Sequence, residues 1–333
     1  MDKNAVSDLF RKFESLTIVV IGDVMIDSYL WGKVDRISPE APVPVVSSTR
    51  KENRLGGAAN VALNLKSLGA KAVMCSVIGS DGNSSLFRNL MKDENLADNL
   101  IVEDRERITT IKTRIISGSQ QLLRVDEENV QYLSKDTEKL FAEKLMAYLS
   151  HNKVDAILFQ DYDKGVITPT LIEQITETAN VKGIPTLVDP KRRNFEAYRH
   201  VSLFKPNFKE FLEGLKTDFD RHNMNQLHAA SRAYLEQSQN RFLLLTLSDL
   251  GIFITDGQKH RLIPAHKRDI TDVSGAGDTV ISVAALCMAS HCNPAETAAM
   301  ANLAGGLVCE KIGVVPVERE RLMQEALYID LIW

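Results

Sequence analysis

The stretch "GGAANVALNLKSLGAKAVMCSVIG" (residues 56–79) changes its pattern halfway, and this change predicts the fold class. Its first half places Ala59, Ala62 and Leu65 at helical spacing and closes at Gly69. Its second half is a short apolar run of the kind found in buried strands. The run "TIVVIGD" (17–23) predicts a strand buried on both faces of a sheet. Together the segments predict a strand, a helix and a second strand.

The same alternation continues along the chain. "VDAILFQD" (154–161) precedes a predicted helix from Thr168, and "IPTLVDP" (184–190) and "RFLLLTLSD" (241–249) predict further strands. This order predicts an α/β protein with a mostly parallel, doubly wound sheet. Residues 28–50 and 106–126 interrupt the alternation, and we expect small antiparallel strands there that extend the sheet and form a lid. We expect residues 1–333 to form one domain, preceded by an amphipathic helix over residues 1–15.

Composition limits the class of partner. The net charge is −4 and basic residues are scattered, so we expect no nucleic-acid or membrane-surface binding and a small-molecule partner instead. No apolar run reaches the length of a membrane span. Cys75, Cys287, Cys292 and Cys309 lack CxxC spacing, which favours reduced thiols and a cytoplasmic protein.

The motif "DVSGAGDT" (272–279) leads from a glycine turn into an apolar helix. One interpretation is structural: Ser274 caps the helix and Asp278 complements the helix dipole. The other is catalytic: the N–H groups of Gly275, Ala276 and Gly277 form an anion hole for a phosphoryl group, and Asp278 is the general base. The chain has no GxxxxGK[ST], no HRD or DFG motif and no GxGxxG after the first strand. These absences disfavour P-loop, protein-kinase and nucleotide-dependent oxidoreductase classes.

"DVSGAGDT" together with "RLGGAANVALNLKSLGAKAVMCSVIGSDG" (54–82) resembles the two signatures of the ribokinase-like (pfkB) carbohydrate kinases. The resemblance runs from about Thr17 to Val317. It implies a three-layer α/β/α sandwich with a small β-sheet lid, and ATP and Mg²⁺ as cofactors. It also implies that Asp278 is the catalytic base behind the anion hole. Lids of this family often pair between subunits, so we expect a homodimer.

Four further segments are similar to family members that phosphorylate D-glycero-β-D-manno-heptose 7-phosphate at O1: "GDVMIDSYLWGKVDRISPEAPVPVV" (22–46), "QQLLRVD" (120–126), "DYDKGV" (161–166) and "DPKRRNF" (189–195). We therefore expect a sugar phosphate and ATP as ligands. In those relatives a second domain, a nucleotidyltransferase, often follows the kinase. We expect either that a separate protein carries the nucleotidyltransferase activity or that this chain acts on a different sugar. The alternatives are another kinase of the family or a non-catalytic sugar or nucleotide sensor.

The resemblance assigns sugar-hydroxyl contacts to Asp27, Gly56, Gly57 and Asn60. Without it, the glycine pair indicates a plain turn before a helix, and Asp27 indicates a solvated strand end. The substrate phosphate needs cations, whereas any one candidate taken alone indicates a solvated surface charge. The candidates are Lys191, Arg192, Arg193, Arg114 and Arg124, of which Lys191 and Arg124 are taken as substrate-binding. Asp161, or its neighbour Asp163 or Lys164, follows a strand end and is expected to line the cleft.

"KPNFKE" (205–210) resembles the family's NxxE motif, which implies that Asn207 and Glu210 order the Mg²⁺. The alternative is a capping box at a helix start. Nucleotide contacts are implied for Ser248, Gly251 and Asn302, for which a hairpin turn and helix packing are the alternatives. The apolar end "ALYIDLIW" (326–333) is expected to pack on the body of the protein or on a partner.

Overall fold

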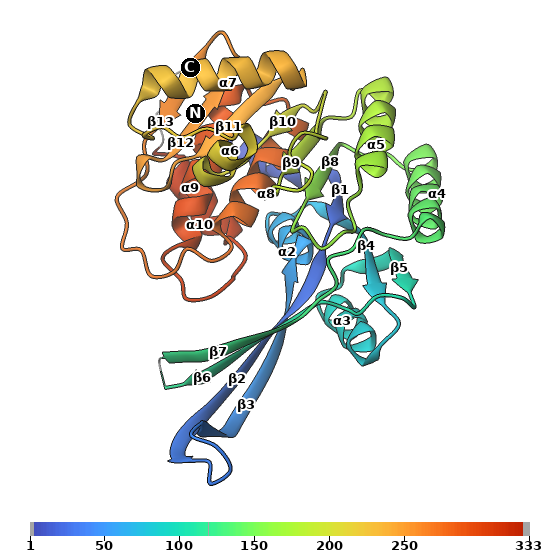
Figure 1. Cartoon of the computed structure of the whole chain (residues 1–333). Helices are drawn as coiled ribbons and strands as arrows, with labels where there is room; N and C mark the ends of the chain where they lie inside the picture. Colours follow the sequence, from blue (N-terminus) through green and yellow to red (C-terminus); the bar gives the residue numbers. More distant parts are fainter. Residues whose placement is uncertain (1–2, 119, 329–333) are drawn as a thin grey trace.

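The computed structural model describes residues 3–118 and 120–328 and is built on a nine-stranded sheet (Figure 1). The strand order is β13-β12-β11-β10-β9-β8-β1-β4-β5, and every neighbouring pair from β11 to β5 is parallel. The strands are β1 (Thr17–Gly22), β4 (Lys71–Gly79), β5 (Ala97–Asp104), β8 (Ala156–Gln160), β9 (Thr186–Asp189), β10 (Leu203–Phe204), β11 (Phe242–Thr246), β12 (Ile252–Thr255) and β13 (His260–Ile263). The predicted mostly parallel α/β sheet is confirmed.

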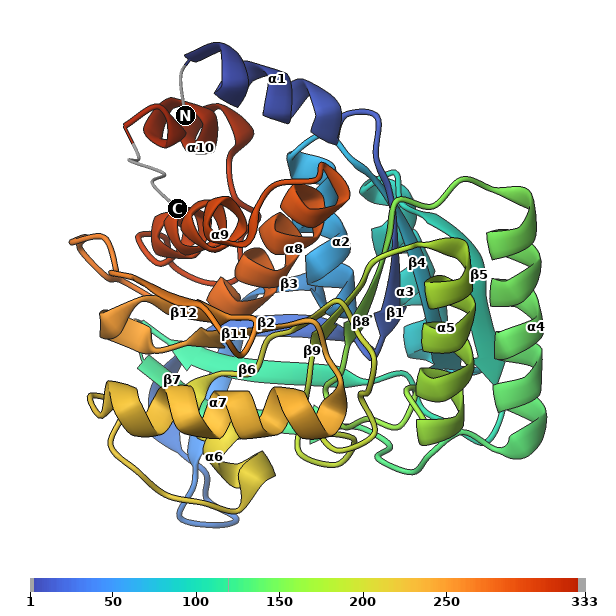
Figure 2. The same ribbon diagram turned by 90° about the horizontal axis from the view of Figure 1, so that it is seen from above.

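Helices cover both faces of this sheet (Figure 2). Side chains alternate across a strand, so Ile18 and Val20 of β1 join one apolar core, whereas Val19 and Ile21 join the other. The first core is completed by α1 (Lys3–Phe13), α2 (Ala58–Ser67), α3 (Gly82–Asp93), α8 (Ala276–Ala289), α9 (Pro294–Val308) and α10 (Arg319–Ala326). The second is completed by α4 (Lys135–His151), α5 (Pro169–Lys182), α6 (Phe208–Leu215) and α7 (Met224–Ser238).

A second sheet projects from the body (Figure 1). It contains β2 (Val24–Ile37), β3 (Pro44–Gly57), β6 (Ile111–Ser117) and β7 (Gln120–Glu127) in the order β3-β2-β6-β7. Both hairpins are antiparallel, but they form a sheet of their own instead of extending the main one, and they join through the parallel pair β2–β6. The reason is topological: β1 and β5 are separated only by β4 and are parallel, so both end at the same end of the main sheet. The strands that follow them, β2 and β6, therefore run in the same direction.

The ends of the chain agree with the sequence where they are described. The predicted N-terminal helix is α1, and the C-terminal helix α10 packs near it (Figure 2). The prediction for "ALYIDLIW" falls largely on residues 329–333, which lie outside the described residues. Among the helices that are described, none has the length and apolar character needed to span a bilayer.

Candidate active site

Polar residues gather where four parallel strands end. Asp23 follows β1, Gln160 ends β8, Asp189 ends β9 and Lys205 follows β10. The first turn of α8 packs against the ends of β8 and β9, so it brings Asp278 to the same edge. Open α/β sheets bind ligands at the carboxyl ends of their strands, and the candidate site occupies that position.

Asp278 is buried and is held by three donors from distant parts of the chain. Asn60 Nδ2 donates to its Oδ2 at 2.7 Å, and the hydroxyl of Tyr162 donates to its Oδ1 at 2.7 Å. Gln160 Nε2 donates to the same Oδ1 at 3.2 Å. Burial raises the pKa of Asp278 to about 6, against the lowering effect of the hydrogen bonds from Asn60 and Tyr162. A carboxylate of this kind accepts a proton near neutral pH.

The turn before Asp278 exposes backbone donors. Gly275 is the N-cap of α8 with φ 79°, a conformation that favours glycine, and the side chain of Ser274 makes no capping hydrogen bond. The structural interpretation of Ser274 as the cap is therefore wrong, because the left-handed Gly275 takes that position. Ala276 N–H donates to the Val273 carbonyl at 3.3 Å, whereas the N–H groups of Gly275 and Gly277 have no acceptor among the described residues. Two free donors at a helix N-terminus suit an anion.

A buried ion pair lies beside this turn. Lys205 Nζ is 2.9 Å from Asp189 Oδ2, and the two side chains are only 3% and 7% exposed. A Cβ placed on Gly277 would lie 3.7 Å from Lys205 Nζ and 3.8 Å from Asp189 Oδ2. The absence of a side chain at Gly277 therefore leaves the helix terminus open toward the ion pair.

The predicted sugar-binding residues lie together at the start of α2 and on β2. Asn60 contacts Asp278 directly, and Gly56 and Gly57 pair with the first residues of β2. A Cβ on Gly56 would lie 2.1 Å from Asp27 Oδ2, so glycine is needed for Asp27 to keep its place. The structure thus brings Asn60 to the candidate base and packs Gly56 against Asp27.

The predicted metal residues form a capping box at the start of α6. Asn207 Oδ1 accepts from the Glu210 N–H, and Glu210 Oε2 accepts from the Asn207 N–H, both at 2.9 Å. The other carboxylate oxygen of Glu210 pairs with Lys191. No cluster of three or more His, Cys, Asp or Glu side chains suited to a metal occurs in the described part of the chain. The amide and carboxylate oxygens fit Mg²⁺ bound mainly through water and phosphate, which needs few protein ligands.

Two of the three predicted nucleotide residues lie against one segment. Ser248 begins the 3₁₀ turn η1 (Ser248–Leu250) between β11 and β12, and Gly251 follows that turn with φ 95°. A Cβ on Gly251 would meet the Ile263 carbonyl oxygen at 2.0 Å. Asn302 of α9 donates to the Pro264 carbonyl at 2.9 Å. Gly251 and Asn302, distant in sequence, therefore both lie against residues 263–264 at the end of β13.

The lid carries two of the predicted cations. Arg114 of β6 is 2.6 Å from Asp27 Oδ1 and lies at the base of the lid, near the sugar-binding residues. Arg124 of β7 is half exposed and pairs with Asp126 at 2.9 Å. The lid also holds Arg54, which no sequence pattern indicated. Its backbone lies opposite Asp27 in the register of β2 and β3, and its guanidinium pairs with Glu52.

The remaining predicted residues lie in two loops. Arg193 stacks on the Tyr132 ring at 3.5 Å, and Arg192 is exposed. Asp161 is buried and accepts a hydrogen bond from Asn194 Nδ2 at 2.8 Å and one from the Asp163 backbone N–H at 2.8 Å. Asp161 therefore holds the two loops together through hydrogen bonds within the protein.

Five residues at the site were missed: Asp23, Gln160, Tyr162, Asp189 and Lys205. All stand at or just after strand ends, the rule that did select Asp161 and Lys191, and applying it to every predicted strand finds them. Gln160 is notable because its Oε1 is buried without a partner among the described residues, which leaves an acceptor beside Asp278.

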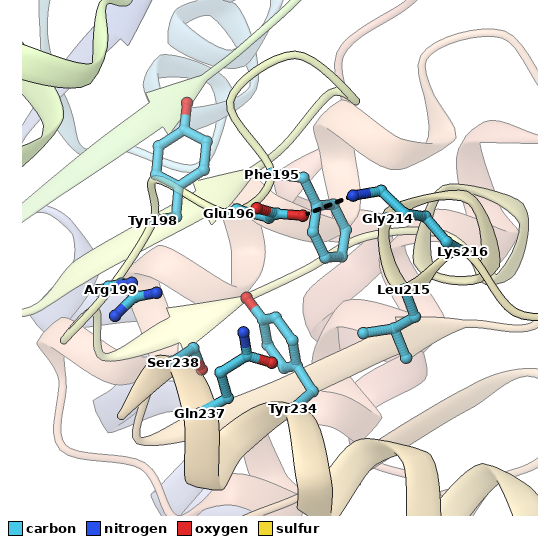
Figure 3. Close-up of a pocket in the computed structure, with 10 residues that line it drawn as sticks. All are labelled: Phe195, Glu196, Tyr198, Arg199, Gly214, Leu215, Lys216, Tyr234, Gln237 and Ser238. Carbon is cyan, nitrogen blue, oxygen red and sulfur yellow. Dashed lines mark hydrogen bonds and ion pairs between the residues drawn. The ribbon is translucent and has the colours of Figure 1, made fainter.

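A separate hollow of about 190 Å³ lies between the loop after β9, the end of α6 and α7 (Figure 3). Its rim charges Glu196 and Lys216 pair with each other at 3.2 Å and are 70% and 80% exposed. Tyr198 lies on its wall and donates to Asp161 at 2.9 Å. None of the residues predicted for the site lines this hollow.

The sheet covered by helices on both faces, the β lid and the glycine turn beside a buried carboxylate are the features that the resemblance to the pfkB carbohydrate kinases implied. The model of the pfkB family of carbohydrate kinases matches residues 15–320. The chain therefore belongs to this family.

The chain is 38% identical over 321 residues to bifunctional protein HldE of Geobacter sulfurreducens, and 39% identical over 323 residues to that of Caulobacter sp. strain K31. The matches cover 95% and 96% of this chain but 64% of each relative, so the chain spans under two thirds of their length.

Phosphofructokinase-2 from Escherichia coli in complex with potassium has a TM-score of 0.77 at 17% identity, covering 94% of this chain and 98% of that one. Its complex with fructose-6-phosphate has a TM-score of 0.75 at 17% identity, with the same coverage. These structures confirm the ribokinase-like fold.

Proposed function

We propose that the chain transfers the γ-phosphate of ATP to O1 of D-glycero-β-D-manno-heptose 7-phosphate, with Asp278 as general base. The observation that carries the proposal is the buried Asp278, held by Asn60 beside two free N–H groups at the start of α8. The similarity to bifunctional HldE proteins supports the choice of sugar.

In the proposed reaction, O1 of the sugar attacks the γ-phosphorus, the bond to the β-phosphate oxygen breaks, and ADP leaves. The proton of the O1 hydroxyl passes to Asp278, whose pKa of about 6 suits an acceptor at neutral pH. The N–H groups of Gly275, Ala276 and Gly277 face the developing negative charge, although the Ala276 N–H must release its long bond to Val273. Glu210 and Asn207 would hold Mg²⁺, which neutralises charge on the ATP phosphates.

The sugar is proposed to lie between α2 and the base of the lid. Asp27, Gly56, Gly57 and Asn60 would contact its hydroxyl groups, with Asp161 anchoring the loop beside them. Its 7-phosphate needs cations, and Arg114 is the candidate nearest to Asp27. Two further candidates are Arg124 on the lid and Lys191, whose ammonium pairs with Glu210. Ser248, Gly251 and Asn302 are proposed to border the nucleotide.

The proposed function is tested by ADP release from Mg-ATP with purified protein and a panel of acceptors: heptose 7-phosphate, fructose 6-phosphate, ribose, fructose and adenosine. We expect selective turnover of the heptose phosphate, abolished when Mg²⁺ is omitted. Turnover of another sugar would contradict the heptose assignment while keeping the kinase. Binding of ATP without turnover of any acceptor would favour a sensor.

The pH dependence follows from the environment of Asp278. A protonated carboxyl cannot accept the O1 proton, so kcat/KM should fall about tenfold per pH unit as the pH drops below about 6. The measurement is the pH–rate profile from about pH 4.5 to about pH 8, in steps of roughly half a pH unit, with protein stability monitored at each point. A rate that stays constant down to pH 5 would contradict Asp278 as the base.

We also propose a homodimer formed through the lid and a cytoplasmic location. The lid exposes Ile37, Val43 and Leu123 at 61%, 51% and 55%, and β7 is an edge strand with every residue exposed. Exposed apolar edge strands favour pairing with another copy. The four cysteines are free thiols, in keeping with a reducing compartment. Sedimentation showing only monomer at micromolar concentration would contradict the dimer.

A further inference from the structure

Tyr162 lies in the loop after β8, and its hydroxyl is 2.7 Å from Asp278 Oδ1. An ionised carboxylate only accepts hydrogen bonds, so the tyrosine must donate. Burial and the charge of Asp278 raise the pKa of Tyr162 well above its usual value, which keeps the hydroxyl protonated. Tyr162 is therefore a permanent donor to one oxygen of Asp278, while Asn60 donates to the other.

The loop that carries Tyr162 is fixed by a buried carboxylate. Asp23, directly after β1, accepts from the backbone N–H groups of Tyr162 at 2.9 Å, Lys164 at 3.1 Å and Val166 at 3.0 Å. Three bonds to alternate residues hold the loop against the end of β1. The position of the Tyr162 hydroxyl is thus set by the main sheet, and Asp278 receives its orientation from both α2 and this loop.

The other polar groups around Asp278 are less direct. Gln160 donates to the same Oδ1 at a longer 3.2 Å and also approaches Asp189 Oδ2 at 3.4 Å. Asp189 and Lys205 act on Asp278 through their charges, in opposite directions. Lys191 lies over the Tyr162 ring at 5.8 Å. Of these neighbours, Tyr162 makes the shortest bond to Oδ1, the oxygen that it shares with Gln160.

We propose that Tyr162 is a positioning residue that holds Asp278 in its charged form and aims the carboxylate at the acceptor hydroxyl. The inference rests on the proposed role of Asp278 as base. It adds that the loop 161–166 contributes to the reaction because it holds the Tyr162 hydroxyl against Asp278.

The test compares Tyr162→Phe with Tyr132→Phe. Tyr132 is a matched control because its hydroxyl donates to Asn194 Oδ1, also at 2.7 Å, and has no contact with Asp278. Loss of a hydrogen bond to a charged group favours the neutral form, so Tyr162→Phe should move the acid limb of kcat/KM upward by about 1–2 pH units. It should also lower kcat at the optimum about tenfold and leave the KM for ATP unchanged. Tyr132→Phe should leave the acid limb of kcat/KM at the same pH as in the wild type.

A second measurement does not depend on turnover. Carbon-13 labelling of aspartate carboxyl groups, with the Asp278 resonance assigned by its loss in Asp278→Asn, reports the pKa of this carboxyl directly. We expect the titration to move upward in Tyr162→Phe and not in Tyr132→Phe. An unmoved titration and an unmoved acid limb would overturn the inference. A moved titration in a protein that phosphorylates no acceptor would contradict the proposed function and leave the Tyr162 contact standing.

Discussion

Asp278→Asn is expected to lower kcat by about 10²- to 10⁴-fold. An asparagine keeps the shape of the side chain but cannot take the O1 proton, and Asn60 can turn its amide over to accept a hydrogen bond from the new amide. ATP binding should remain within about twofold, because the predicted nucleotide residues lie on other elements. The measurements are ADP release under saturating sugar phosphate and calorimetric titration with ATP.

The fold of this variant should be intact. The folded pKa of Asp278, about 6, lies above the ordinary value of 3.8, so the ionised carboxylate costs stability above pH 6 and contributes none. Asn escapes that cost, and the melting temperature at pH 8 should not fall. Asp93→Asn, an exposed position at the end of α3, is the matched control. A kcat within about tenfold of wild type would remove Asp278 from the mechanism.

Lys205→Met is expected to lower the free energy of unfolding by about 3–5 kcal/mol. Lys205 and Asp189 are nearly fully buried at 2.9 Å, and removal of the cation leaves a buried carboxylate whose pKa burial already raises. The uncompensated charge is costly, whereas loss of an exposed pair is not. Urea unfolding at about pH 7.5, with linear extrapolation to zero urea, measures the free energy of unfolding of the variant and of the wild type.

Two further variants separate the charge effect from lost packing. Lys209→Met removes an exposed lysine, 86% accessible, from a pair on α6 and should change the free energy of unfolding by less than about 1 kcal/mol. Lys205→Met combined with Asp189→Asn should regain a large part of the loss, because no buried charge then lacks its partner. A single Lys205→Met variant as stable as wild type would contradict a stabilising role for this pair.

The main sheet was predictable because each element carries a local signal. The residues of β1 that face the two cores are apolar, and α5 begins at Pro169, directly after its N-cap Thr168, where the sequence predicts a helix start. The lid was predictable only as an interruption of the alternation. Its separation from the main sheet and the parallel β2–β6 pair depend on where β1 and β5 end in space, which no local pattern contains.

The candidate site divides in the same way. Gly275, Gly277 and Asp278 form a contiguous motif, so the glycine turn and the helix start were visible in the sequence. The family resemblance pointed to Asn60 as a sugar contact, but its hydrogen bond to Asp278, 218 positions away, was not predicted because no local pattern contains it. Tyr162 lies in the segment "DYDKGV", but that pattern assigned it no role, because its contact with Asp278 is set by the packing of α8 against β8. For Asn207 and Glu210, the capping interpretation is correct, and it leaves the metal role as a prediction because one box of contacts is compatible with both.

The position of the new phosphate decides whether the proposed reaction occurs, and phosphorus-31 NMR reads it on the product made from heptose 7-phosphate and Mg-ATP. We predict a second phosphate resonance, coupled to the anomeric proton, with loss of one ATP γ-phosphate for each product formed and almost no product from Asp278→Asn. A new phosphate on another carbon, or an unchanged heptose 7-phosphate spectrum in the presence of active protein, would contradict the proposed reaction.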